Sequence, residues 1–413
     1  MSKLEELIKE LCPNGVELLP LEKCCTLLDN QRKPITKASR EAGDYPYYGA
    51  NGIQDYVSNY IFNGTYVLVG EDGSVVTPTG NPVVNWAQGK IWVNNHAHIL
   101  AENKNVLLRY LFHYIQTIDI TPYVHGNIPK LTGGDLKSLS IPVPPLEVQR
   151  EIVRILDNFT ELTAELTAEL TARKKQYEFY RDRLLNFEKT QVVFKPLGEL
   201  FPYIRNGFVG TIAPFFTDAE HGIRYLEGTN IHNGTISDNE VLYVTREFHA
   251  AHINNELKSD DILMVQSGHV GECAVVGDKY AGSNCHALII MSNGGKCNSK
   301  FYTYYFHTYE GIKRLTPAIT GGTIKHVLAT KVKDICVPVP PIDIQNRIVN
   351  VLDNFDAICS DLNIGLPAEI EARNKQYEYY RDKLLTFDNS IATILTDRQT
   401  DRQTDRQTDR QPD

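Results

Sequence analysis

Long apolar runs are missing from this sequence. Of its 413 residues, 42% are hydrophobic and 23% are charged, yet no apolar run approaches the roughly 20 residues that a membrane-spanning helix needs. The opening residues, Met1-Ser-Lys-Leu-Glu-Glu, also lack the apolar core of a secretory signal. We therefore expect a soluble, cytoplasmic chain that divides into about two to four domains.

Paired cysteines and a basic charge excess are missing as well. The eight cysteines form no Cys-x-x-Cys pair, so we expect reduced, mostly buried thiols and no metal site. The net charge of −9 argues against a protein that coats DNA by itself, because such proteins are usually basic. It is compatible with a DNA reader whose partners make most of the phosphate contacts.

The common catalytic motifs are also missing. The chain has no phosphate-binding Gly-x-x-x-x-Gly-Lys-Ser/Thr, no glycine-rich methyl-donor loop and no Asn-Pro-Pro-Tyr/Phe adenine pocket. His96 and His286 occupy matching positions, but no nucleophile or metal-ligand set accompanies them. We expect both to be packed, hydrogen-bonded histidines. The prediction is a chain with no catalytic residue of its own.

Two blocks of sequence occur twice. Residues 176–185, QYEFYRDRLL, return as residues 376–385, QYEYYRDKLL, and the block 141–146, IPVPPL, returns as 337–342, VPVPPI. A repeat of about 200 residues indicates two homologous halves and an internal two-fold character. A two-fold protein suits a two-part target, and DNA is the obvious candidate.

The segments between the repeated blocks have diverged. Short apolar runs separated by Gly, Asn and Asp predict target-reading heads, β-rich and turn-rich, at 1–140 and 189–336. The repeated blocks predict conserved helical regions at 141–188 and 337–388. Divergent heads on a constant frame indicate that the heads carry the variable specificity. The predicted fold class is α+β, with two mixed β-rich domains joined by two long antiparallel coiled-coil helices.

A long amphipathic helix is predicted from about 147 to 187. Its apolar residues fall within an arc of about 120° on a helical wheel, and it would be about 60 Å long. The second copy carries an equivalent stripe, so an antiparallel pair would bury both. We expect the second helix to break near Gly365-Leu-Pro367, because proline disfavours helix at the preceding residue. The stripes are formed by Ile152, Ile155, Leu156, Phe159, Leu162, Leu166, Leu170, Tyr177, Tyr180 and Leu184, and by Ile348, Val351, Leu352, Phe355, Ile358 and Leu362.

A short tandem repeat lies inside the first helix. Thr-Ala-Glu-Leu occurs at 163–166 and again at 167–170. One such unit lengthens a helix by about 6 Å, and successive base pairs are about 3.4 Å apart. We interpret the repeat as a ruler that is adjustable in steps of one or two base pairs; a plain helix-forming filler is the alternative.

The last segment, 389–413, contains a Thr-Asp-Arg-Gln repeat. It has no apolar pattern to bury, so we expect it to be disordered. A tetranucleotide tract can encode this repeat. Slippage in such a tract would change the reading frame, and we therefore hypothesise a phase-variable C-terminus.

These features together resemble the specificity (S) subunit of a type I restriction–modification system, in the subgroup with Thr-Ala-Glu-Leu spacer repeats. The resemblance covers nearly the whole chain and rests on the duplicated Pro-x-Pro-Pro block at a fixed distance from Gln149 and Gln345. It implies that each head reads one half of a split sequence in double-stranded DNA. It also implies two modification (methyltransferase) subunits, which use S-adenosylmethionine, and restriction (translocase/nuclease) subunits, which use ATP and Mg. The expected break near Gly365-Leu-Pro367 departs from the helical pattern and puts a perfect two-fold in doubt.

Basic residues in turn-rich segments are the candidate DNA contacts. Sequence readers place Arg, Lys, Asn and Gln against base edges, although a solvated loop charge is the alternative at each position. The candidates are Arg32, Lys33, Lys37 and Arg40 in the first head and Arg205, Arg224, Lys325 and His326 in the second.

The repeated helix ends are the candidate partner surface. Two copies of one surface would accept two copies of one partner subunit. Alternatively, the tyrosines only close the helix pair, and the sequence leaves both interpretations open. The candidates are Gln176, Tyr177, Tyr180, Arg181, Gln376, Tyr377, Tyr380 and Arg381.

Two rival functions belong to other classes of protein. A standalone methyltransferase or nuclease is disfavoured by the missing motifs. A non-catalytic coiled-coil DNA-binding adaptor outside restriction–modification is disfavoured by the two elaborate heads.

Overall fold

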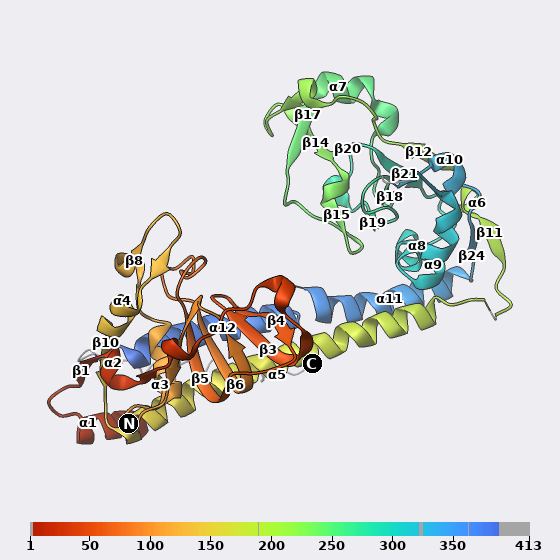
Figure 1. The fold of residues 1–413 in the computed structure, drawn as a ribbon. Helices are drawn as coiled ribbons and strands as arrows, with labels where there is room; N and C mark the ends of the chain where they lie inside the picture. Colours follow the sequence, from red (N-terminus) through yellow and green to blue (C-terminus); the bar gives the residue numbers. More distant parts are fainter. Residues whose placement is uncertain (1–2, 189, 322–324, 362, 388–413) are drawn as a thin grey trace. The chain divides into compact units, whose positions relative to one another are not determined.

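The chain folds into two compact units, seen in a computed structural model (Figure 1). One unit comprises Met1–Leu166 with Glu369–Asp413, and the other comprises Thr167–Ala368. Each contains one mixed β-rich head and part of the helical regions. The structure describes residues 3–188, 190–321, 325–361 and 363–387. The predicted disordered tail at 389–413 lies outside the described residues.

The head of the first unit is built around a mixed six-stranded sheet. In sheet order its strands are β2 (Thr26–Leu27), β7 (Ala97–Ala101), β5 (Phe62–Gly70), β6 (Val84–Val93), β3 (Ala42–Gly49) and β4 (Gly52–Val57). The longest pair, β5 with β6, is antiparallel, and β3 runs parallel to β6. Val67 and Val69 on β5 belong to one buried cluster, whereas Leu68 belongs to another. Because side chains alternate along a strand, both faces of the sheet are covered.

Short elements complete this head. They are α1 (Lys3–Leu11), β1 (Glu17–Pro20), α2 (Leu21–Cys24), α3 (Leu108–Ile115), β8 (Val124–His125), β9 (Lys130–Leu131), α4 (Gly133–Ser138) and β10 (Ser140–Val143). β1 pairs antiparallel with β10, so the first strand of the head lies beside its last. Pro144 and Pro145 follow β10 and lead into the long helix α5, Leu146–Leu184.

The head of the second unit contains two four-stranded sheets. One has the order β12 (Tyr203–Asn206), β21 (Leu288–Ser292), β18 (Ile262–Val265) and β19 (Cys273–Val275); the other has β13 (Phe216–Thr217), β17 (Leu242–Thr245), β14 (Gly222–Leu226) and β20 (Asn284–Cys285). The remaining strands are β11 (Phe194–Pro196), β15 (Ile231–His232), β16 (Thr235–Ile236), β22 (Ile319–Thr320), β23 (His326–Val327) and β24 (Cys336–Pro338). The short helices are α6 (Leu197–Leu200), α7 (Arg246–Ala251), α8 (Ser299–Phe306), α9 (Tyr309–Leu315) and α10 (Ala329–Val332). β11 pairs with β24, as β1 does with β10, so this head closes in the same way.

Weakly related sequence motifs occupy equivalent places in the two heads. In the first head, Asn94 donates its backbone N–H to the carbonyl of Tyr48 at the end of a parallel strand pair. In the second, His286 donates to Leu226 at the end of another parallel pair, β14 with β20. The heads therefore share a fold, as the sequence repeat predicts.

In the first unit, the long helix α5 packs against α12, Leu366–Leu385. The ring of Phe159 on α5 stacks on Tyr380 of α12 at 5.3 Å between centroids. Ile152 and Leu156 are fully buried in the same cluster as Leu384. The apolar stripe predicted for this part of the helix is thus the face that packs.

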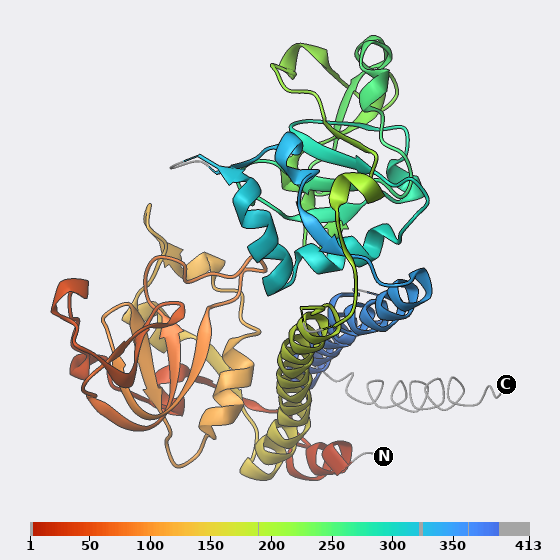
Figure 2. The ribbon, with the colours of Figure 1, turned by 90° about the vertical axis from the view of Figure 1, so that its right-hand side faces the viewer.

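In the second unit, the C-terminal part of α5 runs beside α11, Ile342–Ser360 (Figures 1 and 2). Tyr180 on α5 lies 5.9 Å from Phe355, between ring centroids. Cys359, farther along α11, feels the charges of Arg173 and Lys174, which come earlier on α5. Contact positions that rise on one helix and fall on the other define an antiparallel pair. This confirms the predicted pairing.

The second helical region is broken, as predicted. α11 ends at Ser360 and α12 begins at Leu366. Asp361 accepts the backbone N–H of Asn363 and Ile364 on its carboxylate. A Cβ on Gly365 would lie 2.6 Å from the carbonyl oxygens of Ala357 and Asp361, so no other residue fits there without movement. Pro367 is tolerated because it lies in the first turn of α12.

The cysteines and the helices agree with the composition. The eight thiols are free, and only Cys12 and Cys336 are not buried. Burial raises the pKa of the Cys24 thiol to about 11 and that of Cys25 to about 12. Among the described residues, no helix is both long and apolar enough to span a bilayer.

Candidate nucleic-acid interface and its supporting frame

Each head is held to its frame helix by one buried glutamine. In the first unit, Gln149 accepts the backbone N–H of Leu107 at 2.9 Å and donates to the carbonyl of Pro144 at 2.7 Å. In the second, Gln345 accepts from Asn298 at 2.9 Å and donates to Pro340 at 2.8 Å. Since unpaired buried polar groups are costly, the repeated glutamine serves to fasten the start of α3 or α8 to the start of its helix.

A repeated aspartate makes a second attachment. In the first unit, Asp157 on α5 accepts from Arg109 Nε at 2.7 Å and from His113 Nε2 at 2.8 Å. In the second, Asp353 on α11 receives Lys300 Nζ at 2.8 Å and the Tyr304 hydroxyl at 2.6 Å. The carboxylate is kept while its donors differ. The repeated blocks contain both aspartates, but the donors lie in the divergent heads, and sequence comparison of the halves did not reveal them.

His113 links three elements of the first unit. Its Nε2 faces Asp157, and its Nδ1 lies 2.8 Å from the hydroxyl of Tyr377 on α12. Burial lowers the pKa of His113 below its ordinary value, although Asp157 opposes this. The neutral ring with its proton on Nε2 fits both contacts, because Nδ1 then accepts from Tyr377. Burial alone would raise the pKa of Asp157, but the bonds from His113 and Arg109 outweigh it and lower that pKa.

The predicted arginines of the first head are engaged within the head. Arg32 donates to the Glu71 carboxylate and, at 2.9 Å, to the carbonyls of Asp29 and Ala97. Arg40 lies 4.2 Å over the ring of Tyr47 and pairs with Asp55 at 3.2 Å. Both guanidinium groups support the local fold. Any contact with DNA would have to share these bonds.

The predicted lysines of the first head are exposed. Lys33 and Lys37 belong to the loop around the short 3₁₀ turns at Asp29–Gln31 and Lys37–Ser39. The loop is held by Trp92, whose indole N–H donates to the Lys33 carbonyl at 2.6 Å. Both ammonium groups are therefore available for a phosphate.

The second head shows the same division. Arg205 donates to Ser292 at 2.7 Å and to the Glu256 carbonyl at 3.1 Å. Arg224 donates to the carbonyls of Tyr225, Leu242 and Glu240 at 3.0–3.1 Å. Lys325 and His326 are exposed, and the His326 ring contacts the hydroxyl of Ser267.

The matching histidines differ from the expectation. His96 is hydrogen-bonded, to Asp72, but its side chain is about half exposed, so the prediction of a packed residue is wrong for it. His286 is partly buried, 3.4 Å from the hydroxyl of Tyr225. His96 follows β6 at an open edge of the sheet, which is why packing does not enclose it.

The repeated helix ends have an inner and an outer side. Tyr177 and Tyr377 face inward, and burial raises the pKa of each to about 12. Gln176 and Gln376 are exposed, and each accepts from an arginine three residues earlier, at 3.4 and 3.0 Å. Arg181 and Arg381 pair with the neighbouring Asp182 and Asp382. The inward tyrosines fit the helix-closing interpretation; the outer residues remain available to a partner.

The two copies diverge at the last tyrosine. Tyr380 is 8% exposed, whereas its equivalent Tyr180 is 37% exposed. The aromatic residue before each one points outward: Phe179 is 59% exposed and Tyr379 is 49% exposed. These two outward rings form what we call the duplicated aromatic position, which the predicted partner-binding residues did not include.

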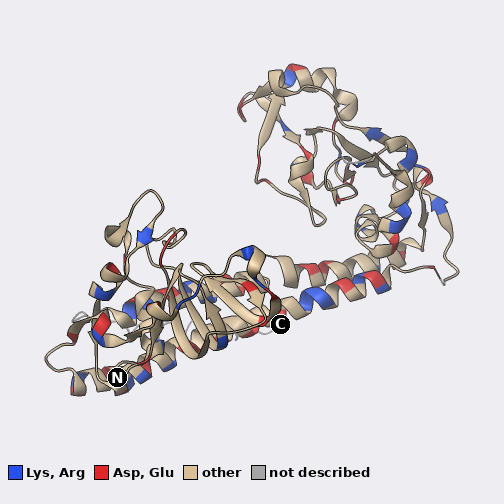
Figure 3. Cartoon of the chain, in the orientation of Figure 1, with Lys and Arg blue, Asp and Glu red and all other residues tan. Residues whose placement is uncertain are grey.

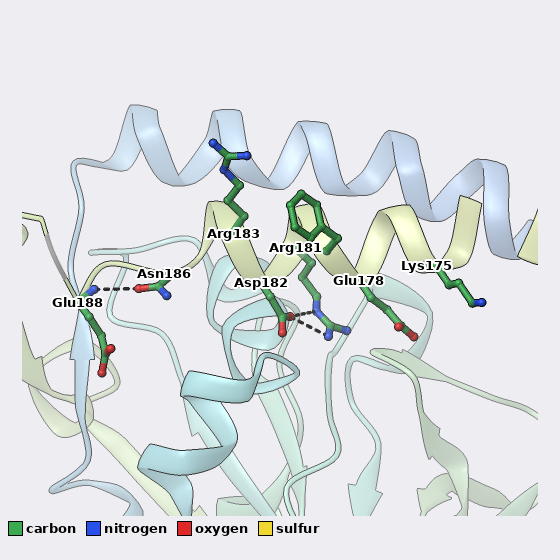
Figure 4. Close-up of a pocket in the computed structure, with 8 residues that line it drawn as sticks. Lys175, Glu178, Arg181, Asp182, Arg183, Asn186 and Glu188 are labelled. Carbon is green, nitrogen blue, oxygen red and sulfur yellow. Dashed lines mark hydrogen bonds and ion pairs between the residues drawn. The ribbon is translucent and has the colours of Figure 1, made fainter. Parts of the chain in front are cut away.

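Phe179 borders an open groove of about 840 Å³ at the end of α5 (Figure 4). Its other lining residues are Lys175, Glu178, Arg181, Asp182, Arg183, Asn186 and Glu188. Acidic and basic side chains alternate here, and Figure 3 shows the same mixture along α11 rather than a basic stripe. A mixed surface with an exposed ring suits a protein partner better than a phosphate backbone.

A family model described as the type I restriction modification DNA specificity domain matches residues 13–173 and again 191–372. The chain belongs to this family. Its role is the recognition of a DNA target within a type I restriction–modification complex, and the enzymatic activities of such complexes reside in other subunits. The adaptor function outside restriction–modification is not favoured.

Known relatives extend over most of the chain. A Haemophilus influenzae protein classed as a type I restriction enzyme specificity subunit is 35% identical over 385 residues, covering 90% of this chain and 96% of the relative. The specificity subunit of the Escherichia coli type I restriction enzyme EcoR124I/EcoR124II is 32% identical over 311 residues, covering 69% of this chain and 72% of the relative.

Solved structures share the fold. The S subunit of a type I restriction–modification system from M. genitalium superimposes with a TM-score of 0.55 at 14% identity, covering 90% of this chain and 97% of the other. A chain from a study of complex assembly in the type I restriction–modification system gives 0.57 at 15% identity, covering 90% and 98%. The predicted two-headed architecture is confirmed.

Proposed function

We propose that each head of this chain reads one half of a bipartite DNA sequence, and that adenine methylation and ATP-dependent cleavage at that site are carried out by partner subunits. The observation that carries the proposal is the duplication: two heads of one fold, each attached by the same glutamine and aspartate, with different residues exposed. A constant attachment with variable heads is what two independent reading domains require.

The proposed partners are two modification subunits and the restriction subunits of the complex, in the cytoplasm. The support for two modification subunits is the duplicated aromatic position with its flanking residues, because one surface repeated on one chain accepts the same protein twice. S-adenosylmethionine, ATP and Mg would bind to those partners. Among the described residues, no group of His, Cys, Asp and Glu could hold a metal ion.

The long helix would set the gap between the half-sites. The Thr-Ala-Glu-Leu units at 163–170 lie within α5, which is helical throughout its 39 residues. Deleting residues 163–166 removes about 6 Å of helix and one turn of about 100° per residue. We expect the unspecified gap of the target to shorten by one or two base pairs while both half-sites stay the same.

Genome-wide sequencing of methylated bases tests the proposal. A strain carrying this gene with its modification subunit should methylate adenines in one bipartite motif, and deletion of this gene alone should abolish that methylation. Persistence of the motif after deletion, or a motif with a single uninterrupted half, would contradict the proposed function.

A further inference from the structure

A small hairpin of the first head presents its side chains to solvent. β8 and β9 are joined by a tight turn in which Gly126 has φ +86°, a conformation that favours glycine. Every residue from His125 to Lys130 is exposed, and Ile128 is 68% exposed. We call residues 125–130 the tip. A large aliphatic side chain left this open on a two-stranded ribbon is not explained by packing within the head.

The tip is fixed to the central strand of the sheet. Leu131 donates its N–H to the carbonyl of Glu71 at 2.8 Å, and Gly73 donates to the carbonyl of Pro129 at 3.0 Å. The Lys130 ammonium lies 3.2 Å from the Glu71 carboxylate. Glu71 directly follows β5 and also pairs with Arg32. The backbone of the tip is therefore held in place while its side chains stay free.

The second head carries the same device with other residues. Val327 donates its N–H to the carbonyl of Gln266 at 2.9 Å, as Leu131 does to Glu71. Isolated bridges pair Ser267 with His326 in this head and Asp72 with Lys130 in the first. In both heads the turn that follows a central strand, β18 or β5, clasps a hairpin. An identical carrier with different exposed side chains is what two different half-sites demand.

The chemistry of the tip suits base edges. An Asn amide can bond both N6 and N7 of adenine, an aliphatic group packs on the methyl of thymine, and the major groove admits a two-stranded ribbon. Asn127 is exposed, and its side chain has no hydrogen-bond partner among the described residues. Lys130 and His125 flank it and can meet phosphates.

We propose that the tip is the base-reading element of the first head, inserted in the major groove, with Asn127 and Ile128 specifying bases of its half-site. This inference rests on the proposed function and adds the surface that performs it. The basic loop at Lys33 and Lys37 then supplies backbone contacts rather than sequence discrimination.

The test uses the complex of this chain with its modification subunits. Duplexes carry the motif found for the wild type, with either half-site intact or scrambled. Asn127→Ala and Ile128→Ser should each weaken binding to the intact duplex by about 5- to 100-fold, the worth of one base contact, and should relax only the first half-site in methylation maps. Discrimination at the second half-site should not change.

The matched control is Asn63→Ala, another exposed asparagine of the same head, on β5. It should bind and methylate as the wild type does. Because the tip side chains are exposed, the variants should keep wild-type melting and co-purification. A double Asn127→Ala, Ile128→Ser complex that reads the first half-site with wild-type affinity would overturn the inference, as would a change confined to the second half-site. Absence of a bipartite motif in the wild type would instead reject the proposed function.

Discussion

Asp157 and Asp353 occupy equivalent places on their frame helices, yet they receive different donors. Arg109 and His113 bind the first, whereas Lys300 and Tyr304 bind the second. The first unit also extends the contact to Tyr377 through the second ring nitrogen of the histidine. The comparison teaches that the frame preserves an acceptor, and that each head may evolve its own donors provided they reach that acceptor. Only the first arrangement contains a group that titrates near neutrality.

The largest difference between the copies is expected at the last tyrosine. Tyr380→Ala should destabilise the packing of α12 on α5 by about 3 kcal/mol, because it empties a buried aromatic site. Tyr180→Ala should cost about 1 kcal/mol or less, since the ring is partly exposed. Hydrogen–deuterium exchange of the helix amides measures both. Equal losses would show that the copies pack alike.

The buried glutamines should be equal where the tyrosines differ. Gln149→Ala and Gln345→Ala each leave a buried N–H and a buried carbonyl unpaired, so each should destabilise its own unit by about 2–3 kcal/mol. Exchange rates in α3 and α8 report the two units separately. Gln176→Ala, an exposed control, should change stability by less than about 0.5 kcal/mol. A large loss in one unit with none in the other would refute the equivalence of the anchors.

The duplicated aromatic position should act twice. Phe179→Ala and Tyr379→Ala should each lower the affinity for one modification subunit by about tenfold, in the range of a moderate interface residue. Native mass spectrometry should then find complexes with a single modification subunit, and the double variant should lose both. Lys375→Ala, an exposed change on the same helix as Tyr379, serves as the control. Full occupancy in the double variant would remove this surface from the interface.

The smallest effect separates the units by pH. Because the pKa of His113 is lowered in the folded chain, the unfolded chain binds this proton more readily, and stability falls as pH drops below about 6.5. The slope contributed by one proton is at most about 1.4 kcal/mol per pH unit. His113→Tyr, which copies Tyr304, should flatten the pH dependence of exchange in α3 and leave α8 unchanged. An unaltered slope would mean that the histidine does not titrate on unfolding.

The sequence predicted what depends on periodicity and repetition. The apolar stripe predicted the helix seen as α5, and Gly365-Leu-Pro367 predicted the break after α11, because both effects are local. The strand order of the heads was beyond reach, since it depends on pairings between distant strands such as β2 with β7. The contact of His113 with Tyr377 spans 264 positions and left no local signal.

The candidate DNA residues show the same limit. Arg32 was chosen as a base in a turn, but Glu71 and the carbonyl of Ala97 reach it from distant strands. The tip at 125–130 carries little charge, so a search for basic runs passed over it. Its signal is the clasp with the turn after β5, which only a fold can show.

The central claim, one half-site for each head, is tested most directly by exchanging a head. Residues 1–140 would be replaced by the aligned segment of the Haemophilus influenzae relative, and methylated bases would be mapped genome-wide. We predict that one half of the motif changes to that of the donor while the other half is retained. A motif that changes in both halves, or in neither, would contradict the claim.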